Sequence, residues 1–174
     1  MNIGSFWHKI SRTEMFGRFH KTSDISVEYL TKHNIKALIL DVDNTLTTHD
    51  NGKAAEGIPE WAEKLRNHGI KLIILSNNNE KRVKPFAESL GMDFVCDVVK
   101  PGRKGYELAM KKLKMKKENV AAVGDQIFTD VWGANNFGIK MLFVEPIQLE
   151  SWKKQPQIRI KRIFEKLFIP KHFN

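Results

Sequence analysis

Residues 37–46 read ALILDVDNTL, an apolar run that ends in two aspartates. The apolar residues are typical of a short buried strand. A carboxylate at the edge of a hydrophobic layer is costly unless it is paired, bound to a metal or catalytic. Asp41 and Asp43 are two residues apart, so in an extended segment their side chains point to the same side. This stretch therefore predicts a strand that brings two carboxylates to one place.

Similar apolar runs recur along the chain, and amphipathic segments separate them. Segment 59–69 begins with Pro59 and ends with Gly69, as helices usually do. This alternation predicts an α/β fold, a three-layer α/β/α sandwich around a mainly parallel sheet that binds ligands at the carboxyl ends of its strands. The expected strands cover residues 35–41, 70–76, 94–99, 120–125 and 140–144.

Asp41, Ser76, Lys100 and Asp125 each lie at or just past the end of a different expected strand. Carboxylate oxygens are the ligands by which Mg²⁺ is held beside a substrate phosphate. A lysine supplies the positive charge that a phosphoryl group needs, and a serine hydroxyl with neighbouring backbone N–H groups can hold a phosphoryl oxygen. These residues predict a phosphoryl-transfer site. The residues expected to bind the substrate phosphate are Ser76, Asn77 and Lys100.

Four short motifs in this order resemble those of the haloacid dehalogenase superfamily. They are DVDNT from Asp41, LSN around Ser76, KP at Lys100 and GDQIFTD around Asp125. The resemblance spans residues 35–146 and implies a Rossmann-like sheet. A single pair of aspartates would be weak evidence, because two aspartates often cap a turn, but four motifs in order are specific.

The resemblance implies a covalent two-step hydrolysis. Asp41 would be the nucleophile that forms an aspartyl-phosphate, and Asp43 would first protonate the leaving oxygen and then activate water. It also implies Mg²⁺ bound by the Asp41 carboxylate, the Asp43 backbone carbonyl and the Asp125 carboxylate, with Asp130 supporting the metal shell.

Several residues have a second interpretation. Lys104 is the alternative to Lys100 as the lysine of the third motif, and the resemblance favours Lys100 because Pro101 follows it. Ser76 can also cap a helix. Asp130 can also be a carboxylate on a helix surface, and the resemblance gives Thr45 a structural rather than a catalytic role.

The spacing of the motifs leaves no room for a cap domain. Only 32 residues separate Asp43 from Ser76, and 23 separate Ser76 from Lys100. An uncapped site suits a phosphate carried on something large, or requires an oligomeric neighbour to cover it. The motifs further resemble the YqeG branch of the capless subclass III, whose relatives dephosphorylate phosphatidylglycerophosphate to phosphatidylglycerol. The resemblance thus implies a lipid phosphate substrate at a membrane surface.

Positive charge concentrates at the carboxyl end of the chain. The net charge is +9, and residues 151–174 hold seven Lys/Arg against Glu165, whereas residues 35–150 are nearly neutral. We expect a basic, aromatic extension at 1–34 that packs on or flanks the core, a phosphatase core at 35–150 and a basic amphipathic helix or tail at 151–174. The tail suits peripheral contact with anionic lipid, or alternatively an ordinary helix that packs on the core.

Two alternative interpretations of the function stay open. A basic chain with aromatic residues beside its bases also fits an RNA-associated or ribosome-associated protein, although no RNA motif is recognised. A phosphatase of another large or soluble substrate is the second alternative. One cysteine and no apolar run near the ~20 residues of a membrane span indicate a cytoplasmic protein, peripheral to the membrane if the tail binds lipid.

Overall fold

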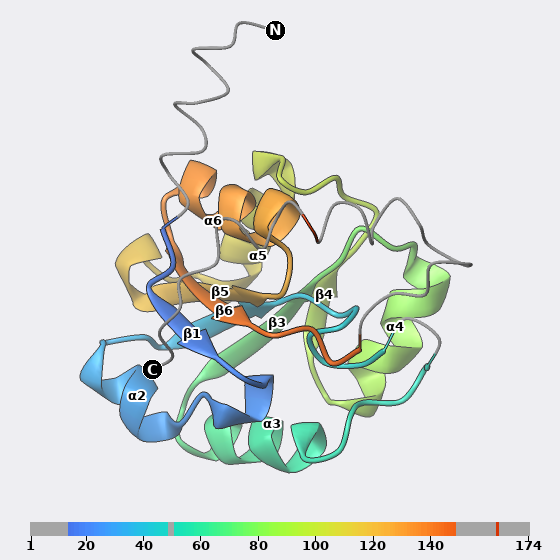
Figure 1. Ribbon diagram of the computed structural model, residues 1–174, viewed down its shortest axis with the longest axis horizontal. Coiled ribbons are helices and arrows are strands. Elements are labelled where there is room, and N and C mark those ends of the chain that lie inside the picture. Colours follow the sequence, from blue (N-terminus) through green and yellow to red (C-terminus); the bar gives the residue numbers. More distant parts are fainter. Residues whose placement is uncertain (1–13, 49–50, 149–162, 164–174) are drawn as a thin grey trace, which may run out of the picture.

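A six-stranded parallel sheet lies at the centre of the computed structural model, which describes residues 14–48, 51–148 and 163 (Figure 1). The strand order is β1-β6-β5-β2-β3-β4, and every neighbouring pair is parallel. This confirms the expected α/β fold. The strands are β1 (Gly17–Phe19), β2 (Ala37–Leu40), β3 (Lys71–Leu75), β4 (Asp93–Val95), β5 (Val120–Gly124) and β6 (Lys140–Val144).

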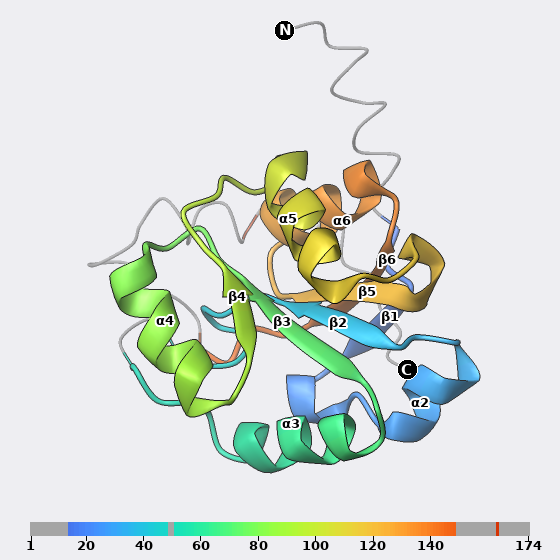
Figure 2. The same cartoon turned by 180° about the vertical axis from the view of Figure 1, so that it is seen from behind.

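Helices cover both faces of the sheet, as Figures 1 and 2 show from opposite sides. Alternate residues of a strand point to opposite faces, so Leu38 and Leu40 pack under α2, α3 and α4, whereas Ala37 and Ile39 pack under α5 and α6. The two buried clusters form a three-layer sandwich. The helices are α2 (Val27–Lys32), α3 (Ile58–Asn67), α4 (Glu80–Ser89), α5 (Arg103–Leu113) and α6 (Trp132–Phe137), with short turns η1 (Thr22–Asp24), η2 (Lys117–Asn119) and η3 (Ile127–Val131).

The helix ends follow the signals in the sequence. Pro59 lies in the first turn of α3, where its missing N–H costs nothing. Gly69 follows that helix with a φ of 78°, a left-handed conformation that glycine adopts without strain. At the start of α4 the Asn79 side chain accepts a hydrogen bond from the backbone N–H of Arg82. This cap gives a partner to one backbone N–H group of the first turn of α4.

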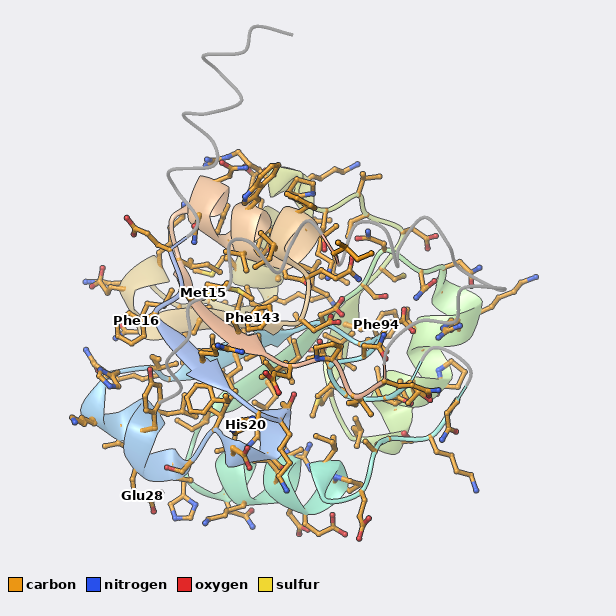
Figure 3. The ribbon with its side chains drawn as sticks, in the orientation of Figure 1. Met15, Phe16, His20, Glu28, Phe94 and Phe143 are labelled. Carbon is orange, nitrogen blue, oxygen red and sulfur yellow. The ribbon has the colours of Figure 1, made fainter. Side chains whose placement is uncertain are left out.

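Strand β1 was not among the expected strands. Gly17 pairs with Leu142 and Phe19 with Val144, so the segment forms an edge of the sheet. The ring of Phe16 packs edge-on against His33, with centroids 5.0 Å apart, and Figure 3 shows Phe16 beside β1. The divisions at residues 34 and 150 stay predictions. The tail at 151–174 lies, apart from residue 163, outside the described residues.

Only short connections follow the strands that carry the first two motifs. Between β2 and α3 the chain has residues 41–57, of which all but 49–50 are described, and between β3 and α4 it has residues 76–79. Neither holds an inserted domain in its described part, so within the described residues these connections leave the carboxyl edge of the sheet uncapped, as expected. No helix within the described part of the chain is long and apolar enough to cross a membrane.

Candidate active site

The carboxyl ends of the inner strands carry the polar residues that the sequence singles out. Asp41 directly follows β2, Ser76 follows β3 and Asp125 follows β5. Because β2 lies between β3 and β5, these three residues are neighbours along one edge. Lys100 reaches the same edge from the segment after β4, and all four residues are buried. The topology thus gathers residues from four strands.

Three carboxylates meet at the centre of this edge. Asp41, Asp125 and Asp130 each offer an oxygen atom, and these atoms lie within 4.8 Å of one another. Asp130 comes from η3, and the backbone N–H of Gln126 donates to its Oδ2 at 3.1 Å. The hydroxyl of Tyr106 donates to its backbone carbonyl at 3.3 Å. These bonds hold Asp130 over the end of β5, where it faces Asp41.

A buried lysine lies against this cluster. The Nζ of Lys100 donates to Oδ1 of Asp130 at 2.6 Å and also to Oδ1 of Asp41. Burial raises the pKa of Asp41 to about 8, with repulsion from Asp130 and Asp125 adding to the rise and Lys100 opposing it. Burial alone would lower the pKa of Lys100, but attraction to Asp130 and Asp41 outweighs it and raises that pKa. A single ammonium group does not balance the negative charge of three ionised carboxyl groups, so the cluster can bind a second cation.

The two candidate lysines of the third motif lie in different surroundings. Lys100 is 6% exposed and contacts two of the clustered carboxylates. Lys104 is exposed on the first turn of α5. The geometry therefore favours Lys100 as the lysine of the site.

Thr45 connects two of the clustered carboxylates. Its Oγ1 lies 3.4 Å from Oδ2 of Asp41 and 3.3 Å from Oδ1 of Asp125, so its single hydroxyl proton can be donated to either. The side chain is buried. These contacts agree with a supporting role for Thr45.

Asp43 lies outside the group of three carboxylates and has partners of its own. Its Oδ1 accepts a hydrogen bond from the Arg82 guanidinium at 2.5 Å, and its Oδ2 accepts one from the Asn78 side chain at 2.5 Å. The sequence reasoning missed both partners. One signal was present: Arg82 is the third residue after the helix cap Asn79, so it lies in the first turn of α4, next to the second motif.

The second motif also joins two loops of the site. The Oγ of Ser76 is buried and accepts a hydrogen bond from the backbone N–H of Asn78 at 3.2 Å. The side-chain Oδ1 of Asn77 accepts one from the backbone N–H of Lys100 at 3.1 Å. Asn77 thus links the loop after β3 to the loop after β4, while its assignment to substrate phosphate stays a prediction.

Known proteins resemble the chain in sequence and in fold. A family model described as haloacid dehalogenase-like hydrolase matches residues 48–138. The protein named probable phosphatase YqeG of Bacillus subtilis (strain 168) is 42% identical over 123 residues, which cover 71% of this chain and 72% of that protein.

Two solved structures share the fold at low identity. An uncharacterized protein of Listeria monocytogenes serotype 4b is 22% identical with a TM-score of 0.54, covering 63% of this chain and 78% of that one. The cobalt-bound deoxy-D-mannose-octulosonate 8-phosphate phosphatase of Haemophilus influenzae is 20% identical with a TM-score of 0.53, covering 64% and 69%.

The uncapped parallel sheet, the clustered aspartates and these matches define one class of protein. The chain belongs to the haloacid dehalogenase-like hydrolase family. Within that family it is a phosphatase, similar to the probable phosphatase of Bacillus subtilis over 71% of its length.

Proposed function

We propose that this phosphatase hydrolyses a phosphate monoester through an aspartyl-phosphate on Asp41, with Mg²⁺ as its cofactor. The observation that carries the proposal is the buried cluster of Asp41, Asp125 and Asp130, with Lys100 bound to two of its members. Such a cluster pairs a nucleophile with the charges that a transferring phosphoryl group requires.

The donor set of the cluster fits Mg²⁺. All three side chains offer oxygen, the ligand that this hard cation prefers, and their oxygens are close enough together to share one ion. The resemblance adds the backbone carbonyl of Asp43 as a further oxygen ligand. When bound, Mg²⁺ neutralises negative charge on the phosphoryl oxygens and keeps the carboxyl groups ionised.

The proposed reaction has two steps. First, an Asp41 carboxylate oxygen attacks phosphorus, the bond to the ester oxygen breaks, and Asp43 gives its proton to the departing alkoxide. Second, Asp43 removes a proton from water, whose oxygen attacks the same phosphorus, so that phosphate leaves and the Asp41 carboxylate returns. Lys100 and the hydroxyl of Ser76 bind phosphoryl oxygens throughout.

For the substrate we propose phosphatidylglycerophosphate, converted to phosphatidylglycerol at a membrane surface by a peripheral, cytoplasmic enzyme. The uncapped edge supports a bulky substrate, and two exposed apolar side chains support an amphipathic one. Val99, next to Lys100, is 81% exposed, and Ile147 is 41% exposed where its backbone N–H donates to the carbonyl of Asn44. The basic tail at 151–174 would add attraction to anionic lipid.

A phosphate-release panel tests both parts of the proposal. The full chain would be assayed with Mg²⁺ on phosphatidylglycerophosphate in vesicles, sugar phosphates, nucleotides and a phosphopeptide, with Asp41→Asn as the blank. We expect release from the lipid to exceed release from every soluble ester in kcat/KM. A sugar phosphate that is orders of magnitude better would overturn the lipid assignment but not the phosphatase chemistry.

A further inference from the structure

Both carboxylate oxygens of Asp43 are held by side chains of one neighbouring segment. Oδ1 accepts from the guanidinium of Arg82 and Oδ2 from the amide of Asn78, each at 2.5 Å. Two donors on two different oxygens fix the plane of a carboxyl group as well as its position. A carboxylate has about four lone-pair sites, so an oxygen can still take or give a proton while these bonds exist.

The segment that supplies these donors is itself anchored at several points. The backbone carbonyl of Asn78 accepts a hydrogen bond from the backbone N–H of Asp97 at 3.0 Å. The backbone N–H of Asn78 donates to the Oγ of Ser76. The backbone N–H of Arg82 is bonded to the cap residue Asn79. The two donors therefore sit on backbone that is fixed to the second motif and to the loop after β4.

We propose that Asn78 and Arg82 are positioning residues that aim the Asp43 carboxyl at the oxygen of the leaving group. We name the pair the Asn78–Arg82 clamp. The inference rests on the proposed function, because it assigns the clamp to the proton transfer in which Asp43 protonates the departing oxygen and later deprotonates water. No other reactant is needed, since the proton comes from Asp43 and returns to it from the attacking water.

The surroundings of the clamp separate this role from a purely structural one. The Arg82 side chain is 43% exposed, and the Asp43 side chain is 12% exposed. An ion pair with one partner this open adds little to folding stability, because water and salt screen it. The contact nevertheless restricts the one carboxyl group that must face the scissile ester, where small misplacements slow a reaction strongly.

Esters with different leaving groups distinguish a defect in proton transfer by Asp43 from a defect in folding or in substrate binding. p-Nitrophenolate departs without being protonated at neutral pH, whereas the alkoxide of a simple alkyl phosphate needs an acid. A mispositioned Asp43 should therefore slow the alkyl ester far more than the p-nitrophenyl ester. A defect in folding or in binding the shared phosphoryl group would slow both equally.

The experiment compares five proteins with Mg²⁺ on p-nitrophenyl phosphate and on glycerol phosphate. They are the wild type, Arg82→Ala, Arg82→Lys, Asn78→Ala and the control Lys81→Ala, which removes the same charge from an exposed neighbour on α4. We expect Arg82→Ala to lower kcat/KM for glycerol phosphate by about 10- to 100-fold and kcat/KM for p-nitrophenyl phosphate by less than about threefold, because kcat/KM reports the steps up to the aspartyl-phosphate and not the later attack of water that both esters share. Arg82→Lys should restore part of the loss, and Asn78→Ala should repeat the pattern.

The other possible outcomes would each contradict either the positioning role or the proposed function. Equal losses of kcat/KM on both esters would overturn the positioning role and would make Arg82 a structural or substrate-binding residue. Losses in Lys81→Ala that match those in Arg82→Ala would also overturn it, because general charge would then explain the effect. A wild-type chain that releases phosphate neither from these esters nor from phosphatidylglycerophosphate in vesicles would overturn the proposed function, and this inference with it.

Discussion

Gly124 lies so close to Asp130 that a Cβ atom on the glycine would stand 2.5 Å from the Cγ of the aspartate. Real Cβ atoms do not approach other carbons this closely, so one of the two groups would have to move. Gly124 is the last residue of β5 and is held by the sheet, whereas Asp130 sits in the short π-helix η3. The absence of a side chain at residue 124 is thus what allows Asp130 to reach the site.

The first prediction follows from this contact. Gly124→Ala should displace Asp130 and lower Mg²⁺-dependent phosphate release by at least about tenfold, and overpacking should cost about 1–3 kcal/mol of stability. Activity and the thermal midpoint would be measured together. Gly52→Ala is the matched control, because nothing lies within 4 Å of the Cβ it would add. Normal activity in Gly124→Ala would show that the position of Asp130 does not matter.

The second prediction concerns the two carboxylates of the first motif. Asp43→Asn should reduce kcat by about 100- to 10,000-fold, because it removes the acid and base of both steps. Asp41→Asn should reduce it at least as much, because an amide is a far weaker nucleophile. Removing Mg²⁺ with a chelator should have the same effect and be reversed by adding the metal. Full activity of Asp41→Asn would exclude the aspartyl-phosphate.

The third prediction concerns pH. Burial raises the pKa of Asp41 from its ordinary 3.8 to about 8, so over this range the folded protein keeps a proton that the unfolded chain has released. The contribution of this carboxyl group to folding stability is therefore complete below its ordinary pKa of 3.8, and it is lost as the pH rises toward its folded pKa of about 8. We expect the metal-free protein to become less stable across this range.

Mg²⁺ should counteract that loss. Because the metal binds the ionised carboxylate, its stabilising effect on the thermal midpoint should grow as the pH rises toward the pKa of Asp41. Thermal melting with and without Mg²⁺ over the range measures this. In Asp41→Asn the metal effect should be smaller and should vary less with pH. A wild-type metal effect that is constant across the range would contradict the prediction.

The fourth prediction concerns the basic tail. Replacing Arg159, Lys161, Arg162 and Lys166 by glutamine should weaken binding to anionic vesicles by about 100-fold or more at low salt, since each near-surface charge contributes about 1 kcal/mol. The loss should shrink as salt screens the charges. Hydrolysis of a soluble ester is the control and should persist. Unchanged vesicle binding would reject membrane docking, and salt-sensitive RNA binding by the wild type alone would favour the alternative partner.

The sequence was sufficient to predict which polar residues lie at the carboxyl ends of the strands. Asp41, Ser76 and Asp125 each follow an apolar run directly, and parallel strands must place such residues on one edge. Strand β4 was expected at 94–99 but covers Asp93–Val95. The chain leaves the sheet earlier because Asp97 adopts a φ of 53° and its N–H is bonded to Asn78 rather than to a strand.

Features that depend on tertiary pairing could not be predicted. Strand β1 has only the three residues Gly17–Phe19, too few for any periodicity, and it exists because β6 offers an open edge for pairing. The contact of Arg82 with Asp43 depends on the direction in which α4 leaves the sheet, a property of packing rather than of spacing. The burial of Lys100 and the exposure of Lys104 are also tertiary properties, although the resemblance had already favoured Lys100 because Pro101 follows it.

The central place of β2 has a consequence for protein synthesis. Its partner β5 begins at Val120, so the strand that carries Asp41 pairs on that side only with residues made some eighty positions later. A growing chain on the ribosome can pair β2 with β3 much earlier, yet its cluster of three carboxylates stays incomplete until Asp130 has been added and has emerged. The growing chain is therefore expected to have no phosphatase activity before Asp130 is in place, and any fragment that stops before residue 130 is expected to be inactive.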